Sequence, residues 1–193
     1  MSREPAVAGR FYPGDPDALR TEVGRCLGAV LPGQAGAAVA ILVPHAGYVY
    51  SGPVAGATFA SVILPRLNVI LCPNHTGLGE PIAVANRGVW HTPLGPAKIN
   101  EALADHLLDM CALACADERA HLREHAAEVQ LPFLQVTLEE FSFVPICVGT
   151  GRLPALTQLG NDLGAAIASF DEPVGIIISS DMSHYIPAPV ARA

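Results

Sequence analysis

The chain has 193 residues and a formal net charge of −7, with 51% hydrophobic and only 15% charged residues. This composition is typical of a folded globular protein and excludes a disordered one, and the length predicts a single domain, 1–193. A nucleic-acid-binding face needs clustered basic residues, which the sequence lacks, so we expect no nucleic-acid partner. We also expect no membrane partner, because no apolar run is long enough to span a bilayer. No signal region follows the N-terminus, and the five cysteines are an odd number without zinc-ribbon spacing, which favours a cytoplasmic protein.

Helices are expected where apolar residues recur every three or four positions, and strands where short apolar runs are bounded by proline or glycine. Asp15 and Pro16 are typical of a helix start, and Asn100 can cap another helix. The expected helices cover residues 16–31, 52–63, 100–110, 118–131 and 154–170, and the expected strands cover residues 39–43, 69–72, 143–148 and 174–179.

Two further patterns complete the predicted architecture. Residues 82–85 and 89–92 flank Asn86-Arg87-Gly88, which predicts a β-hairpin, and Pro132 is expected to break or kink the helix over 118–131. Strands that alternate with helices of ten or more residues predict an α/β/α sandwich with a mostly parallel or mixed central sheet.

Three of the predicted strands each run into a turn that carries a histidine. The turns are PHAGY (44–48), PNHTG (73–77) and DMSHY (181–185). Ligands bind at the carboxyl ends of strands in open α/β sheets, and imidazole is both a common metal ligand and the usual acid or base near neutral pH. The sequence therefore predicts that His45, His75 and His184 converge on one site.

The roles of these residues stay open at this point. His45 and His75 could bind a metal or only satisfy hydrogen bonds in their loops; Fe(II) would need an added carboxylate, whereas copper or zinc would accept a thiolate. Asp181 and His184 could form an acid–base pair, could orient a metal ligand, or could mark a turn that caps a helix.

Two more histidines lie on the predicted helix over 118–131. His121 is expected on a solvated face, whereas His125 stands beside apolar residues and is a candidate for the site. Cys72, three residues before His75, is expected to belong to the core.

Five segments, in this order, resemble the Memo family, whose bacterial members form the B component of the AmmeMemoRadiSam system. They are REPAVAGRFYP (3–13), PHAGYVYSG (44–52), PNHTG (73–77), EHAAEVQLPFL (124–134) and SSDMSHY (179–185). The resemblance implies a fold like that of the class III, LigB-like extradiol dioxygenases, an α/β sandwich that holds non-haem iron in those enzymes. It places His45 and His75 at metal-ligand positions and Asp181 and His184 at catalytic pocket positions. His125 is a further candidate for lining this catalytic pocket.

The family's remaining metal ligand is a cysteine in a C-terminal segment that has no counterpart in this sequence. We therefore expect a C-terminally truncated Memo-like domain whose third metal ligand is missing.

Two functions follow from these patterns and from the resemblance. The first is a metal-dependent oxidoreductase with Fe(II) or copper, or zinc, acting on a catechol-like small molecule. The second is a non-catalytic metal-binding or adaptor protein whose pocket holds a peptide or another ligand. The family context implies radical-SAM and AMMECR-like proteins as partners.

Overall fold

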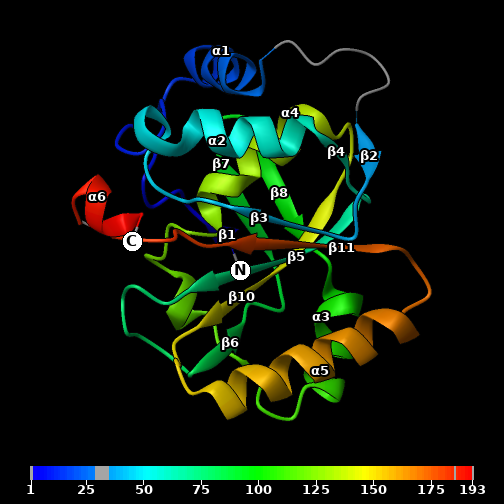
Figure 1. Cartoon of the computed structure of the whole chain (residues 1–193). Coiled ribbons are helices and arrows are strands. Elements are labelled where there is room, and N and C mark those ends of the chain that lie inside the picture. Colours follow the sequence, from blue (N-terminus) through cyan, green and yellow to red (C-terminus); the bar gives the residue numbers. More distant parts are fainter. Residues whose placement is uncertain (1, 29–34, 185, 193) are drawn as a thin grey trace.

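The computed structural model describes residues 2–28, 35–184 and 186–192. In these ranges nine strands form one sheet with helices on both faces (Figure 1). The strands of this sheet are β1 (Ser2–Arg3), β3 (Ala40–Val43), β5 (Leu67–Pro73), β6 (Ile82–Val84), β7 (Val89–Thr92), β8 (Gly95–Ile99), β9 (Cys115–Ala116), β10 (Ser142–Val148) and β11 (Val174–Ser179). The helices are α1 (Pro16–Leu27), α2 (Tyr48–Ala60), α3 (Glu101–Met110), α4 (Leu131–Thr137), α5 (Leu153–Ser169) and α6 (Ala188–Ala191).

The sheet is mostly parallel, as expected. Its strand order is β1-β7-β8-β10-β5-β11-β3, and β6 pairs with β10 and β9. Among these pairs only β7–β8 and β6–β10 are antiparallel. A separate parallel pair joins β2 (Gly36–Ala37) to β4 (Val62–Ile63).

Helices cover the sheet in two layers, each with its own apolar core. Helices α1, α2 and α4 lie over one face and α3 and α5 over the other (Figure 1). Phe59 and Phe133 stack in the first core, and Leu107 and Leu163 belong to the second. The α/β/α sandwich is thus confirmed. None of the helices in the described ranges has the length and apolar character needed to cross a membrane.

Helix α1 begins where its sequence predicts, whereas helix α2 begins and ends earlier than predicted. Asp15 caps α1 by accepting a hydrogen bond from the Ala18 N–H, as predicted, and residues 29–31 of the expected helix lie outside the described residues. Helix α2 begins at Tyr48 and ends at Ala60, earlier than the expected 52–63. Its small residues allow close approach to α1: a Cβ added at Gly56 would overlap the backbone of Cys26.

The predicted hairpin over residues 82–92 is wrong. All three residues of β6 are buried, and the strand pairs antiparallel with β10 instead of β7. Strand β7 pairs with β8, so the hairpin lies one connection later. An apolar strand buried on both faces gains more from a place inside the sheet than from a two-stranded ribbon at its edge.

The predicted helix over residues 118–131 is also wrong. Two short 3-10 turns, Arg119–His121 and Glu128–Gln130, occupy this stretch, and Pro132 stands in the first turn of α4 instead of breaking a helix. His121 is only 1% exposed, against the solvated position expected, and its Nε2 lies 3.1 Å from the Ala83 carbonyl oxygen. The polar side chains of this stretch are buried because distant parts of the chain supply their partners.

Arg3 provides the most extensive of these contacts. Its buried guanidinium donates to the Glu128 carboxylate at 2.8 Å and to the carbonyl oxygens of His121 and Glu124 at 2.8 and 2.7 Å. It also lies 4.1 Å from the centre of the Trp90 ring, close enough for a cation–π interaction.

Glu128 in turn holds the segment that follows Arg3. Its carboxylate accepts hydrogen bonds from the backbone N–H groups of Ala6 and Val7 and from the hydroxyl of Tyr12. Burial and the adjacent Glu128 charge raise the pKa of Tyr12, so the phenol keeps the proton that it donates. The Arg3–Glu128 pair therefore fixes the N-terminal segment against the stretch that carries Glu124 and His125.

We predict that Arg3→Met lowers the free energy of unfolding by about 3–5 kcal/mol, because it leaves the Glu128 carboxylate buried without its charge partner. Urea unfolding at 25 °C measures this difference. Arg25→Met is the control, since Arg25 forms an exposed ion pair with Glu22 on α1 and its loss should leave the urea midpoint unchanged. A loss below about 1 kcal/mol for Arg3→Met would contradict the assigned role.

Candidate metal centre

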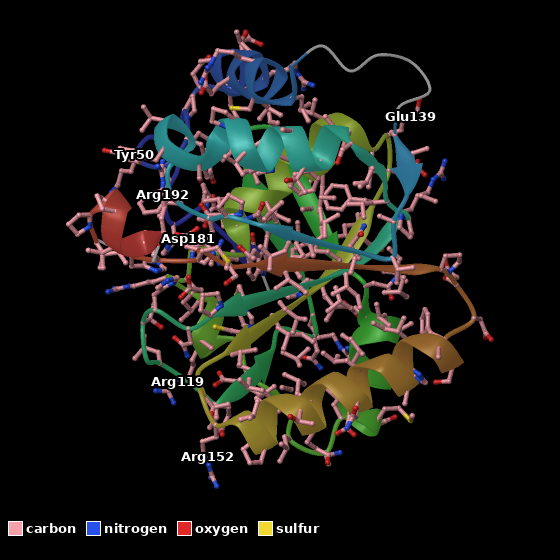
Figure 2. All side chains as sticks on the ribbon, viewed as in Figure 1. Tyr50, Arg119, Glu139, Arg152, Asp181 and Arg192 are labelled. Carbon is pink, nitrogen blue, oxygen red and sulfur yellow. The ribbon has the colours of Figure 1, made fainter. Side chains whose placement is uncertain are left out.

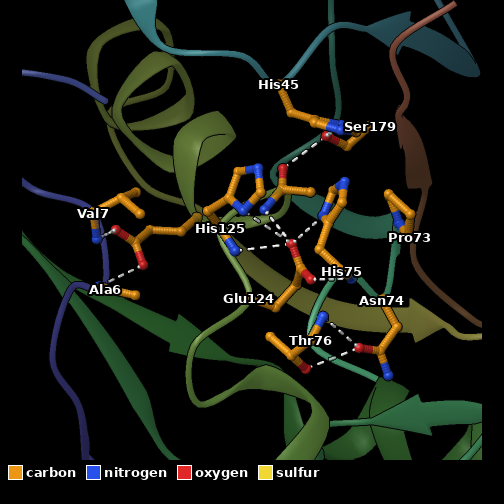
Figure 3. A network of polar contacts seen from close by, with 12 residues as sticks. Ala6, Val7, His45, Pro73, Asn74, His75, Thr76, Glu124, His125 and Ser179 are labelled. Atoms are coloured by element: carbon orange, nitrogen blue, oxygen red, sulfur yellow. Dashed lines mark hydrogen bonds and ion pairs between the residues drawn. The ribbon is translucent and has the colours of Figure 1, made fainter. Parts of the chain in front are cut away.

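The parallel sheet brings the predicted histidine turns to one edge. In β3 and β11 Val43 is in register with Ser179, and β5 pairs with β11 on its other side, so the three carboxyl ends lie side by side. The ring centres of His45 and His75 are 5.1 Å apart, and His125 lies 5.7 Å from His45 and 4.6 Å from His75. Figure 3 shows the side chains of His45, His75 and His125 close to one another.

Ser179, Gln130 and Ala126 determine which nitrogen of His45 carries the proton. The Ser179 hydroxyl donates its only hydrogen to the Ala126 carbonyl oxygen at 2.7 Å and accepts a hydrogen bond from the Gln130 amide at 2.9 Å. Its oxygen also lies 3.1 Å from Nδ1 of His45. Because the hydroxyl has no second hydrogen to give, His45 Nδ1–H must be the donor in this contact. The lone pair of the neutral ring is therefore on Nε2.

Nε2 of His45 is buried and has no hydrogen-bond partner among the described residues. The nearest carboxylate oxygen, Oδ2 of Asp181, is 3.7 Å away. Burial lowers the pKa of His45 to about 4, and the neighbouring imidazoles of His75 and His125 add to this shift while Asp181 opposes it. At neutral pH this ring is an uncharged donor with a free lone pair, the form that binds a metal ion.

Glu124 orients the other two imidazoles (Figure 3). Its buried carboxylate lies 2.9 Å from Nδ1 of His75 and accepts hydrogen bonds from the backbone N–H groups of His75, His125 and Ala126. Burial alone would raise the pKa of Glu124, but these hydrogen bonds outweigh it and lower the pKa. An ionised carboxylate only accepts, so His75 Nδ1–H is the donor and the lone pair of His75 is on Nε2.

The turn that carries His75 is fixed by its own side chains. The Asn74 side-chain oxygen accepts hydrogen bonds from the backbone N–H groups of Thr76 and Gly77. Gly77 has a φ of +67°, a conformation that glycine adopts without strain. The backbone of the turn therefore requires a glycine at position 77. Gly47, two residues after His45, caps the start of α2 with an ordinary negative φ.

His125 completes the group without a helix to position it. Its Nδ1 is 3.4 Å from the Glu124 carboxylate, and its ring stacks on His75 at an interplanar angle of 24°. Phe11 packs against it from the N-terminal segment, with ring centres 4.7 Å apart. Burial lowers the pKa of His125, so it too is held in the neutral form.

Asp181 and His184 lie at the outer side of the cluster. Oδ1 of Asp181 accepts a hydrogen bond from the His45 backbone N–H at 2.9 Å, and Oδ2 is 3.4 Å from Nε2 of His184. The His184 side chain is 48% exposed and its ring centre is 6.0 Å from that of His45. This pair therefore connects the buried imidazoles with solvent.

The donor atoms are close enough to share one ion. One ligand atom from each of His45, His75 and His125 lies within 4.8 Å of the others, and the same holds for His45, Asp181 and His184. Three neutral imidazoles suit iron, copper and zinc, and the buried, unpartnered Nε2 of His45 is the kind of atom that such an ion would satisfy. The residues therefore fit a transition-metal ion.

The sequence patterns found the histidines but not the groups that hold them. His45, His75, His125, Asp181 and His184 all lie at the cluster, whereas Cys72 is buried in the core next to Cys147. Gln130 and Ser179 lie in two of the segments that carry the family resemblance, but no pattern in the sequence indicated that they hold His45. Glu124 stands next to His125 in the sequence, but its role depends on His75, which is 49 positions away.

Comparisons with known proteins agree with the sequence resemblance. The profile of the family described as Memo-like protein matches residues 3–191. A MEMO1 family protein of Methanothermobacter thermautotrophicus is 37% identical over 203 residues, which cover 100% of this chain and 73% of that protein. MEMO1 family proteins of Aquifex aeolicus and Thermotoga maritima are 44% and 41% identical, covering 98% and 96% of this chain and 70% and 71% of their own lengths.

We predict that Ser179→Ala shifts His45 of the metal-free protein toward the Nε2–H tautomer, because the acceptor for Nδ1–H is removed. Long-range ¹H–¹⁵N NMR of the histidine rings distinguishes the two tautomers. Metal affinity should fall about 10- to 100-fold, as is usual when the hydrogen-bond partner of a metal-binding histidine is lost. Ser180→Ala is the matched control, since the Ser180 hydroxyl donates to the Asp181 carbonyl oxygen and not to a histidine of the described residues. An Nε2–H tautomer in the parent protein would contradict the assignment.

Proposed function

Because this chain belongs to the Memo-like family, we propose that it binds one iron or copper ion through Nε2 of His45 and the imidazoles of His75 and His125. Zinc is an expected substitute, since neutral imidazole binds all three metals. The observation that carries this proposal is the buried Nε2 of His45, which has a free lone pair and no partner among the described residues. Leaving such a polar atom unpaired is unfavourable unless a ligand satisfies it.

The surroundings of each imidazole support this role. The Ser179 hydroxyl and the Glu124 carboxylate hold the Nδ1–H groups of His45 and His75, which is how proteins fix the tautomer and direction of histidine ligands. The buried Glu124 charge is also able to balance part of the charge of a bound cation. In this proposal His125 is the third ligand, a role that the family resemblance assigns to a cysteine.

We further propose that the site is that of an oxidoreductase of the non-haem dioxygenase type. A bound iron or copper ion would supply the one-electron and O2 chemistry that side chains lack. The contribution of the chain would be proton transfer, because Asp181 lies between the buried His45 and the half-exposed His184. An imidazole next to a carboxylate at the solvent boundary can take a proton from a phenolic substrate and pass it to water.

The alternative is a protein that binds the metal without catalysis. Such a protein needs the three imidazoles but has no need of a path for protons between the buried His45 and solvent. The position of Asp181 and His184 therefore favours the oxidoreductase.

We predict that the full chain, purified without oxygen, binds one Fe(II) or Cu(I) ion, and that His45→Ala or His75→Ala weakens binding by about 100-fold or more. His125→Ala should weaken binding to a smaller extent, because its Nδ1 is less firmly held. Metal analysis after gel filtration, combined with competition by a chelator, measures these affinities. His91→Ala is the control, since His91 contacts Ser2 on β1, away from the cluster. Unchanged metal content in the His45 and His75 variants would show that the ligands are elsewhere.

Oxygen uptake separates the two functions. With catechol and the metal-loaded protein, an oxidoreductase consumes O2 in proportion to substrate, and His184→Gln lowers the rate while metal content stays constant. Full metal occupancy without oxygen uptake over a range of catechols would favour the non-catalytic alternative.

A further inference from the structure

A groove of about 570 Å³ opens next to His125, between the N-terminal segment and the stretch before Glu124. Phe11 and His125, whose rings pack together, form part of its lining. The groove therefore adjoins one of the three imidazoles of the cluster, and its volume is in the range of small-molecule sites.

Two arginines, Arg10 and Arg123, line the same groove. Both side chains are exposed, and neither guanidinium has an ion-pair or hydrogen-bond partner within the described residues. The chain has only 11 basic residues against 18 acidic ones, and the groove gathers two of these few cationic side chains. The groove also contains the exposed carboxyl side chain of Glu4 at its lining.

The surroundings give these arginines a defined place. The backbone N–H of Arg10 donates to the carbonyl oxygen of Val7 at 3.0 Å. Val7 is itself held by Glu128, whose carboxylate accepts a hydrogen bond from the Val7 N–H. Arg123 precedes Glu124, the buried carboxylate that holds His75 and His125. The hydrogen bonds of Glu124 and Glu128 thus fix the backbone at both arginines. A backbone that is already fixed loses little conformational entropy when a ligand binds.

We propose that this groove binds the carboxylate or phosphate group of a small molecule, held by the guanidinium groups of Arg10 and Arg123 beside the rings of Phe11 and His125. Guanidinium presents paired N–H donors that match the oxygens of both anions. The bound anion would place the rest of the molecule against His125, the histidine of the cluster that lines the groove. Only this last role, the delivery of a substrate, rests on the proposed metal site; the binding of the anion does not.

The test is an NMR titration of the metal-free full chain with benzoate, inorganic phosphate and the neutral analogue benzamide. We expect saturable shifts at Arg10, Arg123 and His125 with an anion and none with benzamide. Arg10→Ala and Arg123→Ala should each weaken binding about three- to tenfold, as expected for a solvent-exposed, charge-assisted contact. Glu4→Gln should strengthen it, because a like charge is removed.

Arg152→Ala is the matched control. Arg152 is an exposed arginine at the start of α5, and Figure 2 shows it projecting away at the lower edge of the molecule. Its loss should not change the titration. Preference for benzoate or for phosphate would identify which anion the groove takes. Binding that persists unchanged in the double variant Arg10→Ala/Arg123→Ala, or equal binding of benzamide, would overturn the proposal.

The same titration of His45→Ala/His75→Ala separates the two proposals. Retained anion binding together with lost metal binding is the expected result. An anion site that survives in a parent protein without any metal affinity would leave this inference standing and the proposed function refuted.

Discussion

The buried carboxylate of Glu124 joins parts of the chain that no local rule would bring together. It accepts four hydrogen bonds, two from His75 and one each from the backbones of His125 and Ala126, and it does so at zero exposure. Removing a charge from water is costly, and here the cost is offset by donors that also position two imidazoles. The direction of the lone pair on His75 follows from this one charge.

The buried Arg3–Glu128 ion pair holds Glu124 in its place. Arg3 donates to the backbone carbonyl of Glu124 as well as to the carboxylate of Glu128, so the N-terminal segment stabilises the loop in which Glu124 lies. The same segment contributes Phe11 to the packing of His125. The metal centre and the neighbouring groove therefore depend on contacts between residues 3–12 and 121–130. These contacts, and not a regular helix, hold residues 121–130 in position.

Local patterns predicted the elements that depend on local physics. The strands around β3, β5, β10 and β11 are short apolar runs ended by proline or by a turn, and the caps Asp15 and Asn100 make the hydrogen bonds expected of them. His45 and His75 converge because they follow parallel strands, whose carboxyl ends lie at the same edge of the sheet. The alternation of strands and helices in the sequence already indicated a parallel sheet.

The errors come from residues whose partners are distant in sequence. The helix expected over residues 118–131 does not form. Glu124 and Glu128 bind His75 and Arg3, which stand 49 and 125 positions away, and these tertiary hydrogen bonds overrode the helical pattern. Strand β6 was assigned to a hairpin because its pairing with β10 cannot be read from residues 82–92. Ser179 fixes the tautomer of His45 only because the pairing of β3 with β11 brings the two residues together. The expectations of iron or copper, of a catechol-like substrate and of radical-SAM and AMMECR-like partners stay predictions.

The most direct test of the account is the count of imidazole ligands around the bound ion. X-ray absorption spectroscopy of the full chain loaded with one equivalent of Zn(II) reports this number. The account predicts three imidazole ligands in the parent protein and two in His125→Ala. A parent spectrum dominated by thiolate, or one that is unchanged in His125→Ala, would contradict the claim that His45, His75 and His125 form one metal centre.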